Sequence, residues 1–199
     1  MKNKTVDYYN QNAEKWEERT VKADNSYRIK IVKEFKKIMS KGRIIELGCG
    51  TGLDAVILTK NGYEYCGIDV SKELLLIAKK NLPDGNFLQM DLEKMSFKDN
   101  SFDGFWASAS LLHVSKDKIG GILNKIKKIC KMGSSGFISL KVGDGEELDK
   151  ETGLFFAYYQ KQEIQKILEN YGFKIVKIEI TKDVLNREGQ GWMWIFLKI

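Results

Sequence analysis

A chain of 199 residues, 43% hydrophobic and 30% charged, has the size and composition of one globular domain. No apolar run approaches the roughly 18 residues of a membrane span, and the first twenty residues lack the apolar core of a signal peptide, so we expect a cytoplasmic protein without membrane contact. The net charge of +6 is compatible with nucleic-acid binding, but the excess is nearly all lysine on predicted helix faces, which favours a solvated surface.

The predicted elements begin with helices and then alternate with short strands. Apolar residues recur at helical spacing in the N-terminal segment and again over about 27–40. We therefore interpret residues 1–40 as an N-terminal helical cap and residues 41–199 as the core of a single domain. Strands are expected at 43–47, 63–70, 86–92 and 102–110, with helices over 52–62 and 72–82 between them, the second capped by Ser71.

The second half continues the alternation. Ser115 is expected to cap a helix that runs to about 131, followed by a strand at 136–142 and a helix over 161–172. The acidic segment 143–153 is either a solvated loop, which we favour, or a lid over a substrate. Two closing strands at 173–181 and 192–199 are expected to be antiparallel to each other. The pattern as a whole predicts an α/β fold with a mostly parallel sheet.

Unusual residues follow five of the predicted strands. In an open parallel sheet, ligands bind beyond the carboxyl ends of the strands. Glycines allow the backbone to lie against a ligand, and an acid about 20 residues later accepts the hydroxyls of a ribose. The residues at these ends therefore predict a nucleoside cofactor; they are Gly48, Gly50, Gly52, Asp69, Asp91, Ala107, Ser108, His113 and Lys141.

The acid before the first glycine indicates which cofactor binds. A dinucleotide requires G-x-G-x-x-G and places its pyrophosphate on a helix N-terminus, where Glu46 would repel it. The spacing here is G-x-G-x-G, and S-adenosylmethionine carries a sulfonium and an ammonium that a carboxylate attracts. We therefore predict S-adenosylmethionine, and a nicotinamide-dependent oxidoreductase is the alternative from another class.

The segments ELGCGTG, GIDVS, QMDLEKM and FDGFWASASLLHV, in this order, resemble the four successive motifs of class I S-adenosylmethionine-dependent methyltransferases. The resemblance covers about residues 40–180. It implies a Rossmann-like, seven-stranded, mostly parallel sheet with an antiparallel C-terminal hairpin and helices on both faces. A narrower resemblance, carried by WASASLLHV, SLKVGDGEE and GLFFAYY, is to a bacterial small-molecule branch grouped with tellurite-resistance and quinone-type enzymes.

This resemblance also implies a set of cofactor contacts. The glycine loop would hold the methionine part, the acid after the second strand the ribose, and the acid after the third strand the adenine amino group. The segment after the fourth strand would contact the methionine part, and the N-terminal helices would cover the cofactor; for these helices the alternative is simple packing on the domain. The residues are Tyr9, Trp16, Arg19, Glu46, Leu47, Gly48, Cys49, Gly50, Gly52, Asp69, Val70, Met90, Asp91, Leu92, Ala107 and Ser108.

The implied reaction is an in-line displacement in which an O, N, S or activated C nucleophile takes the methyl group and S-adenosylhomocysteine leaves. Alignment of the reactants supplies about 7–11 kcal/mol, whereas a positioned base adds roughly 10²–10⁴-fold. His113, the only histidine, is the candidate base because histidine titrates near neutrality; a packing or capping role is the alternative. Substrate contacts are expected from Leu111, His113, Lys141, Tyr158 and Tyr159, with only one of the two tyrosines lining the pocket.

Motifs of other methyltransferases are missing from the sequence. WASAS replaces the Asn/Asp-Pro-Pro-Tyr of amino-directed DNA methyltransferases, and neither a Pro-Cys pair nor a pair of glutamates after the fourth strand occurs. We predict a small-molecule acceptor. A tRNA-modifying methyltransferase is the runner-up, because of the basic charge and NREGQGWMWI, and a non-catalytic cofactor-binding partner subunit is a third possibility. The scattered cysteines Cys49, Cys66 and Cys130 predict buried reduced thiols and no metal site.

Overall fold

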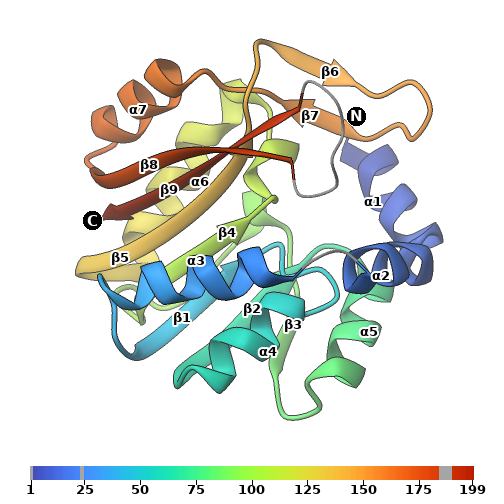
Figure 1. Ribbon diagram of the computed structural model, residues 1–199, viewed down its shortest axis with the longest axis horizontal. Coiled ribbons are helices and arrows are strands. Elements are labelled where there is room, and N and C mark those ends of the chain that lie inside the picture. Colours follow the sequence, from blue (N-terminus) through green and yellow to red (C-terminus); the bar gives the residue numbers. More distant parts are fainter. Residues whose placement is uncertain (1, 23–24, 184–189) are drawn as a thin grey trace.

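A seven-stranded sheet in the order β3-β2-β1-β4-β5-β9-β8 lies at the centre of the computed structural model, which describes residues 2–22, 25–183 and 190–199 (Figure 1). β1 to β5 are parallel, and β9 is antiparallel to both β5 and β8. This topology confirms the predicted fold, including the antiparallel pair at the C-terminal end. The strands are β1 Gly42–Leu47, β2 Tyr63–Asp69, β3 Asn86–Gln89, β4 Phe102–Ser108, β5 Cys130–Lys141, β8 Lys174–Lys182 and β9 Gly191–Lys198.

Helices cover both faces of the sheet, because consecutive side chains of its central strands point to opposite sides. On β4, Phe105 belongs to one buried apolar cluster and Trp106 to the other. The first cluster is completed by α6 and α7, and the second by α3 and α4, which lie on opposite sides of the sheet (Figure 1). The helices are α1 Lys2–Gln11, α2 Ala13–Lys22, α3 Ser26–Lys36, α4 Leu53–Lys60, α5 Lys72–Asn81, α6 Lys116–Ile129 and α7 Lys161–Asn170.

The N-terminal cap consists of two helices that pack on α5 (Figure 1). The helical conformation is interrupted between them at Asn12, whose side-chain amide donates to the carbonyl of Tyr8. Polar bonds attach α1 to the core: the Ser71 hydroxyl donates to Asn10 Oδ1 at 2.7 Å, and the Phe155 N–H donates to Thr5 Oγ1 at 3.2 Å. The cap is therefore held both by α5 and by the strand that contains Phe155.

The structure differs from the sequence-based expectations in three segments. Within 143–153, β6 Glu146–Leu148 pairs with β7 Phe155–Ala157, so an antiparallel hairpin replaces the expected open loop. β3 ends at Gln89 rather than at 92, because Asp91 Oδ1 accepts from the Glu93 N–H and starts a 3-10 turn. β5 begins at Cys130, directly after α6, rather than at 136.

The cysteines are buried and carry free thiols, as expected. Across the described ranges, no group of three His, Cys, Asp or Glu side chains is arranged to hold a metal ion. No helix in this part of the chain has the length and apolar character that crossing a membrane requires.

Substitution of Ser71 by alanine is expected to lower the free energy of unfolding by about 1 kcal/mol, because the hydroxyl accepts from the Leu74 N–H at the start of α5 and donates to Asn10. Urea denaturation measures the loss. The matched control is Ser115→Ala: Ser115 precedes α6 but its side chain makes no cap bond, contrary to expectation, so its stability should match the wild type. Equal losses in the two variants would contradict the role of Ser71.

Candidate active site

A cavity of about 580 Å³ opens at the carboxyl ends of the parallel strands, a size that suits a small-molecule site. The loops after β1, β2, β3 and β4 form its floor, and residues from the N-terminal helices and β7 complete its wall. The structure brings together thirteen of the predicted site residues in this wall: Tyr9, Trp16, Glu46, Gly48, Cys49, Gly50, Asp69, Val70, Met90, Asp91, Leu92, Ser108 and His113.

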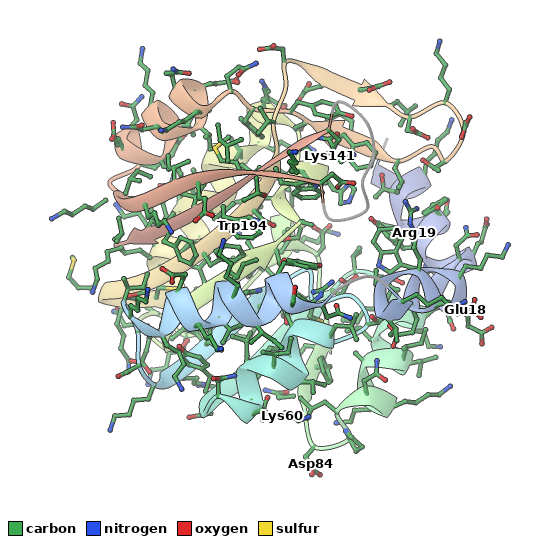
Figure 2. The ribbon with its side chains drawn as sticks, in the orientation of Figure 1. Glu18, Arg19, Lys60, Asp84, Lys141 and Trp194 are labelled. Atoms are coloured by element: carbon green, nitrogen blue, oxygen red, sulfur yellow. The ribbon has the colours of Figure 1, made fainter. Side chains whose placement is uncertain are left out.

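The remaining predicted residues lie away from the cavity wall. Alternation along the strands turns the side chains of Leu47 and Ala107 into the apolar cluster under α6, where Leu111 is also buried. Neither of the two adjacent tyrosines lines the cavity: the Tyr159 ring is fully buried, and the Tyr158 hydroxyl donates to Glu147. Arg19, Gly52 and Lys141 are likewise outside the wall. Figure 2 marks Arg19 on α2 and Lys141 where β5 ends.

The three glycines after β1 are surrounded differently, so each position favours glycine for its own reason. Gly50 has a φ of +53°, and a Cβ added there would meet nothing within 4 Å. A Cβ at Gly48 would lie 2.5 Å from the Cβ of Ser110, and one at Gly52 would lie 3.1 Å from the Cβ of Ala78. Packing within the protein therefore also accounts for two of the glycines, and the expectation that all three make room for a ligand stays a prediction. Gly50 leaves open space, whereas Gly48 and Gly52 accommodate packing within the protein.

Asp69 fixes the glycine loop against β2. Its Oδ2 accepts from the Gly50 N–H at 2.8 Å, and its Oδ1 accepts from the Ser71 N–H at 2.9 Å. Burial raises the pKa of Asp69, while these N–H donors act in the opposite direction. A half-buried carboxylate therefore stands where β1 and β2 end, and it keeps further lone pairs for a ligand.

A second group of buried charges lies beside the loop. Glu46, 2% exposed, accepts from the Tyr65 hydroxyl, and burial together with the charge of Asp54 raises the pKa of Glu46 well above its ordinary value. Asp54, in the first turn of α4, pairs with the guanidinium of Arg28 and accepts from Trp106 Nε1 at 2.8 Å.

Sequence reasoning did not single out Arg28 and Asp54, although both line the cavity. Asp54 lies only two residues after the last glycine, in the first turn of a helix, which is a signal that the sequence carried. Arg28 gave no comparable signal, because it lies on α3 and reaches Asp54 only through the tertiary packing of α3 on α4.

His113 lies in a 3-10 turn after β4 and is held on both ring nitrogens. Nδ1 is 2.7 Å from the carbonyl oxygen of Phe155, which can only accept, so Nδ1 carries the proton. Nε2, 3.0 Å from the Tyr9 hydroxyl, therefore accepts from it. Burial lowers the pKa of His113 to about 4. The expected titration near neutrality is not what the structure gives, because a buried imidazole resists protonation.

Features of the wall show that a nucleoside cofactor with a cationic end fits this cavity. The Ser110 hydroxyl oxygen is buried at the wall without a hydrogen-bond partner, and an unsatisfied buried polar group is costly unless a ligand reaches it. Gly50 leaves open space where other residues carry a Cβ. The carboxylates of Glu46 and Asp69 provide acceptors for a cation and for hydroxyls.

Comparison with known proteins agrees with this geometry. A family model for the methyltransferase domain matches residues 45–138, which include the glycine loop, Asp69, Asp91 and His113. This part of the chain matches a methyltransferase domain. The match supports the predicted S-adenosylmethionine-dependent class and its cofactor.

Two named relatives of this methyltransferase domain align with only part of the chain. The Bacillus subtilis protein YqeM is 36% identical over 81 residues, 39% of this chain and 33% of that protein. An O-methyltransferase of Aspergillus nomiae is 28% identical over 155 residues, 71% of this chain and 68% of that enzyme. The chain thus spans from a third to about two thirds of the length of these curated relatives.

A solved structure shares the methyltransferase fold over nearly the whole chain. It is the 1,6-didemethyltoxoflavin-N1-methyltransferase of Burkholderia thailandensis, solved with bound 1,6-didemethyltoxoflavin and S-adenosylhomocysteine. It superposes with a TM-score of 0.77 at 16% identity and covers 97% of this chain and 87% of that one. The likeness supports the fold, including the antiparallel C-terminal strands.

The two glycines of the loop are expected to respond differently to alanine. Gly50→Ala should cost about 1–2 kcal/mol of stability through its left-handed backbone and should weaken S-adenosylmethionine binding at least tenfold, because the methyl group enters the open space. Gly52→Ala should lose at least as much stability, because its methyl group meets Ala78 and Phe87, with affinity close to the wild type in the folded protein. Urea denaturation and calorimetry separate the two effects. Wild-type affinity in Gly50→Ala would contradict this assignment.

Proposed function

We propose that this protein transfers the methyl group of S-adenosylmethionine to a small-molecule acceptor. The observation that carries the proposal is one cavity whose wall joins the Gly50 loop, buried carboxylates and a neutral histidine. When bound, the cofactor supplies an activated methyl group, and S-adenosylhomocysteine is left after the transfer. The chain's own contribution is to bind, align and exclude water, which supplies most of the acceleration.

The proposed contacts follow the charges of the wall. Glu46 would face the cationic methionine end, because an opposite charge stabilises its ionised form against burial. Asp69 would accept the ribose hydroxyls and Asp91 the adenine amino group. The other wall residues from the sequence prediction would flank the cofactor, with Tyr9 and Trp16 on the cap side.

The electrostatic character of the cavity supports a small neutral or cationic acceptor over tRNA. Among the described residues, the cations in the wall are Arg28, paired with Asp54, and Lys118, paired with Glu93. Seven carboxylates share the wall: Glu46, Asp54, Asp69, Asp91, Glu93, Asp117 and Glu146. A phosphate backbone requires unpaired cations, which this wall does not offer. Of the segment that suggested tRNA, residues 186–189 lie outside the described residues.

Named relatives support an oxygen or nitrogen nucleophile, since one is an O-methyltransferase and the matched structure an N1-methyltransferase. The tellurite-resistance and quinone-type branch, the cytoplasmic location and the single-domain organisation with a cap over 1–40 stay predictions. An oxidoreductase is disfavoured because Glu46 would meet the pyrophosphate of a dinucleotide. A non-catalytic partner subunit is the remaining alternative, and detection of methyl transfer by the purified protein would exclude it.

Replacement of Glu46 by glutamine is expected to weaken S-adenosylmethionine binding by about tenfold or more, since it removes the buried negative charge and keeps the shape. In the wild type, affinity should rise with pH through the raised pKa of Glu46, because the cation binds the deprotonated form, and this rise should vanish in Glu46→Gln. Calorimetry at several pH values measures both effects. Glu64→Gln, on the exposed side of β2, is the matched control. Unchanged affinity in Glu46→Gln would contradict the assignment of Glu46 to the cationic end of the cofactor.

Incubation of the protein with methyl-labelled S-adenosylmethionine and a cell metabolite extract should label a low-molecular-weight product. The same assay with bulk tRNA should give none, and tRNA should not bind tightly at low salt. Chromatography separates the two classes of product. Labelled tRNA, or salt-sensitive tRNA binding, would favour the runner-up instead.

A further inference from the structure

We propose that Lys141, which lies outside the cavity wall, is a positioning residue that acts across the ring of Phe156 and, in addition to burial, disfavours protonation of His113. It thereby helps to keep His113 Nε2 available as a proton acceptor. The electrostatic arrangement stands on the structure itself, whereas its use in a methyl transfer rests on the proposed function.

Three side chains from three elements form the arrangement. Lys141 ends β5, is 7% exposed, and places its Nζ 3.5 Å from the ring centroid of Phe156 on β7. The Phe156 ring lies 5.1 Å from the imidazole of His113, with 39° between the ring planes. One aromatic ring thus contacts both a buried ammonium and the imidazole. Figure 2 marks Lys141 at the end of β5.

The ammonium disfavours a second positive charge on the neighbouring imidazole. A cation is attracted to the face of an aromatic ring, which holds Lys141 on Phe156. A like charge nearby lowers the pKa of a histidine, and so does burial. For His113, burial is the largest cause of the lowered pKa; the Phe155 carbonyl acts in the opposite direction and Lys141 lowers the pKa further.

Other charged and titratable groups surround this cluster. Tyr9 on α1 is a neutral donor, because burial raises its pKa. Glu146 on β6 and Asp117 and Lys118 on α6 share the cavity wall but are solvent-exposed, where water screens their charges. Asp149, between β6 and β7, has a pKa lowered first by Thr152 and weakly by Lys141. Lys141 is thus the buried cation of this cluster in the described part of the chain.

Two neighbouring residues of β7 act on the tautomer and the charge of His113. The Phe155 carbonyl holds the proton on Nδ1, and the Phe156 ring brings the ammonium close. Nε2 therefore presents a lone pair across the physiological pH range. It accepts from Tyr9 in this structure, and the O–H or N–H of an acceptor would take over this bond.

The test is the titration of His113 by ¹⁵N-edited NMR, in which the only histidine gives unambiguous ring signals. In the wild type we expect the Nδ1–H tautomer at pH 7 and a midpoint well below 6.5. Lys141→Met should raise the midpoint measurably, because the like charge is gone. Lys141→Arg should restore the wild-type value. Lys150→Met, at an exposed lysine of the β6–β7 hairpin, is the matched control and should change nothing.

A wild-type midpoint in folded Lys141→Met overturns the proposal, and so does an Nε2–H tautomer in the wild type. If Lys141→Met does not fold, the titration is repeated on Lys141→Gln. If neither variant folds, a His113 midpoint near 6.5 in the wild type overturns the proposal. Calorimetry with S-adenosylmethionine on the wild type keeps the two proposals apart. Loss of cofactor binding would defeat the proposed function, whereas an unchanged midpoint would defeat only the role of Lys141.

Discussion

Burial of carboxylates at the ends of parallel strands is the constraint on which the rest of this structure depends. The topology gathers Glu46 and Asp69 at one edge of the sheet, where an ionised group is stable only if donors or cations reach it. Asp69 is satisfied by backbone N–H groups, and Asp54 by Arg28 and Trp106. Among the described residues, Glu46 accepts from a phenolic hydroxyl, and the nearby cation Arg28 is paired with Asp54. This asymmetry makes the Glu46 end of the cavity the natural place for a positively charged ligand.

The same constraint explains the shape of the glycine loop. Gly50 donates its N–H to Asp69, which requires the chain to turn sharply after β1 with positive φ. Because Gly48 packs on Ser110 and Gly52 on α5, the loop is fixed on two sides by the protein and is open only at its middle. A rigid loop with one open position aligns a ligand without a large ordering cost.

Sequence reasoning predicted the mostly parallel α/β sheet, its antiparallel ending and most of the floor of the cavity, because strand ends and glycine spacing are local patterns. It could not predict the pairing of Arg28 with Asp54, which joins residues 26 positions apart through the packing of two helices. The ionisation of His113 was also out of reach, since it depends on burial and on Phe155, 42 residues away. Tyr158 and Tyr159 were placed beside the substrate because the hairpin that carries β7 was not foreseen.

Phe155 connects two parts of the molecule through a single residue. Its N–H is bound by Thr5 of the N-terminal cap, and its carbonyl fixes the proton of His113. Tyr9, from the same cap helix, occupies the opposite nitrogen of that ring. Departure of α1 from β7 would therefore remove the phenolic donor from Nε2 and the hydroxyl acceptor from the Phe155 N–H together. The cap helix and β7 thus hold opposite sides of the one imidazole in the cavity wall.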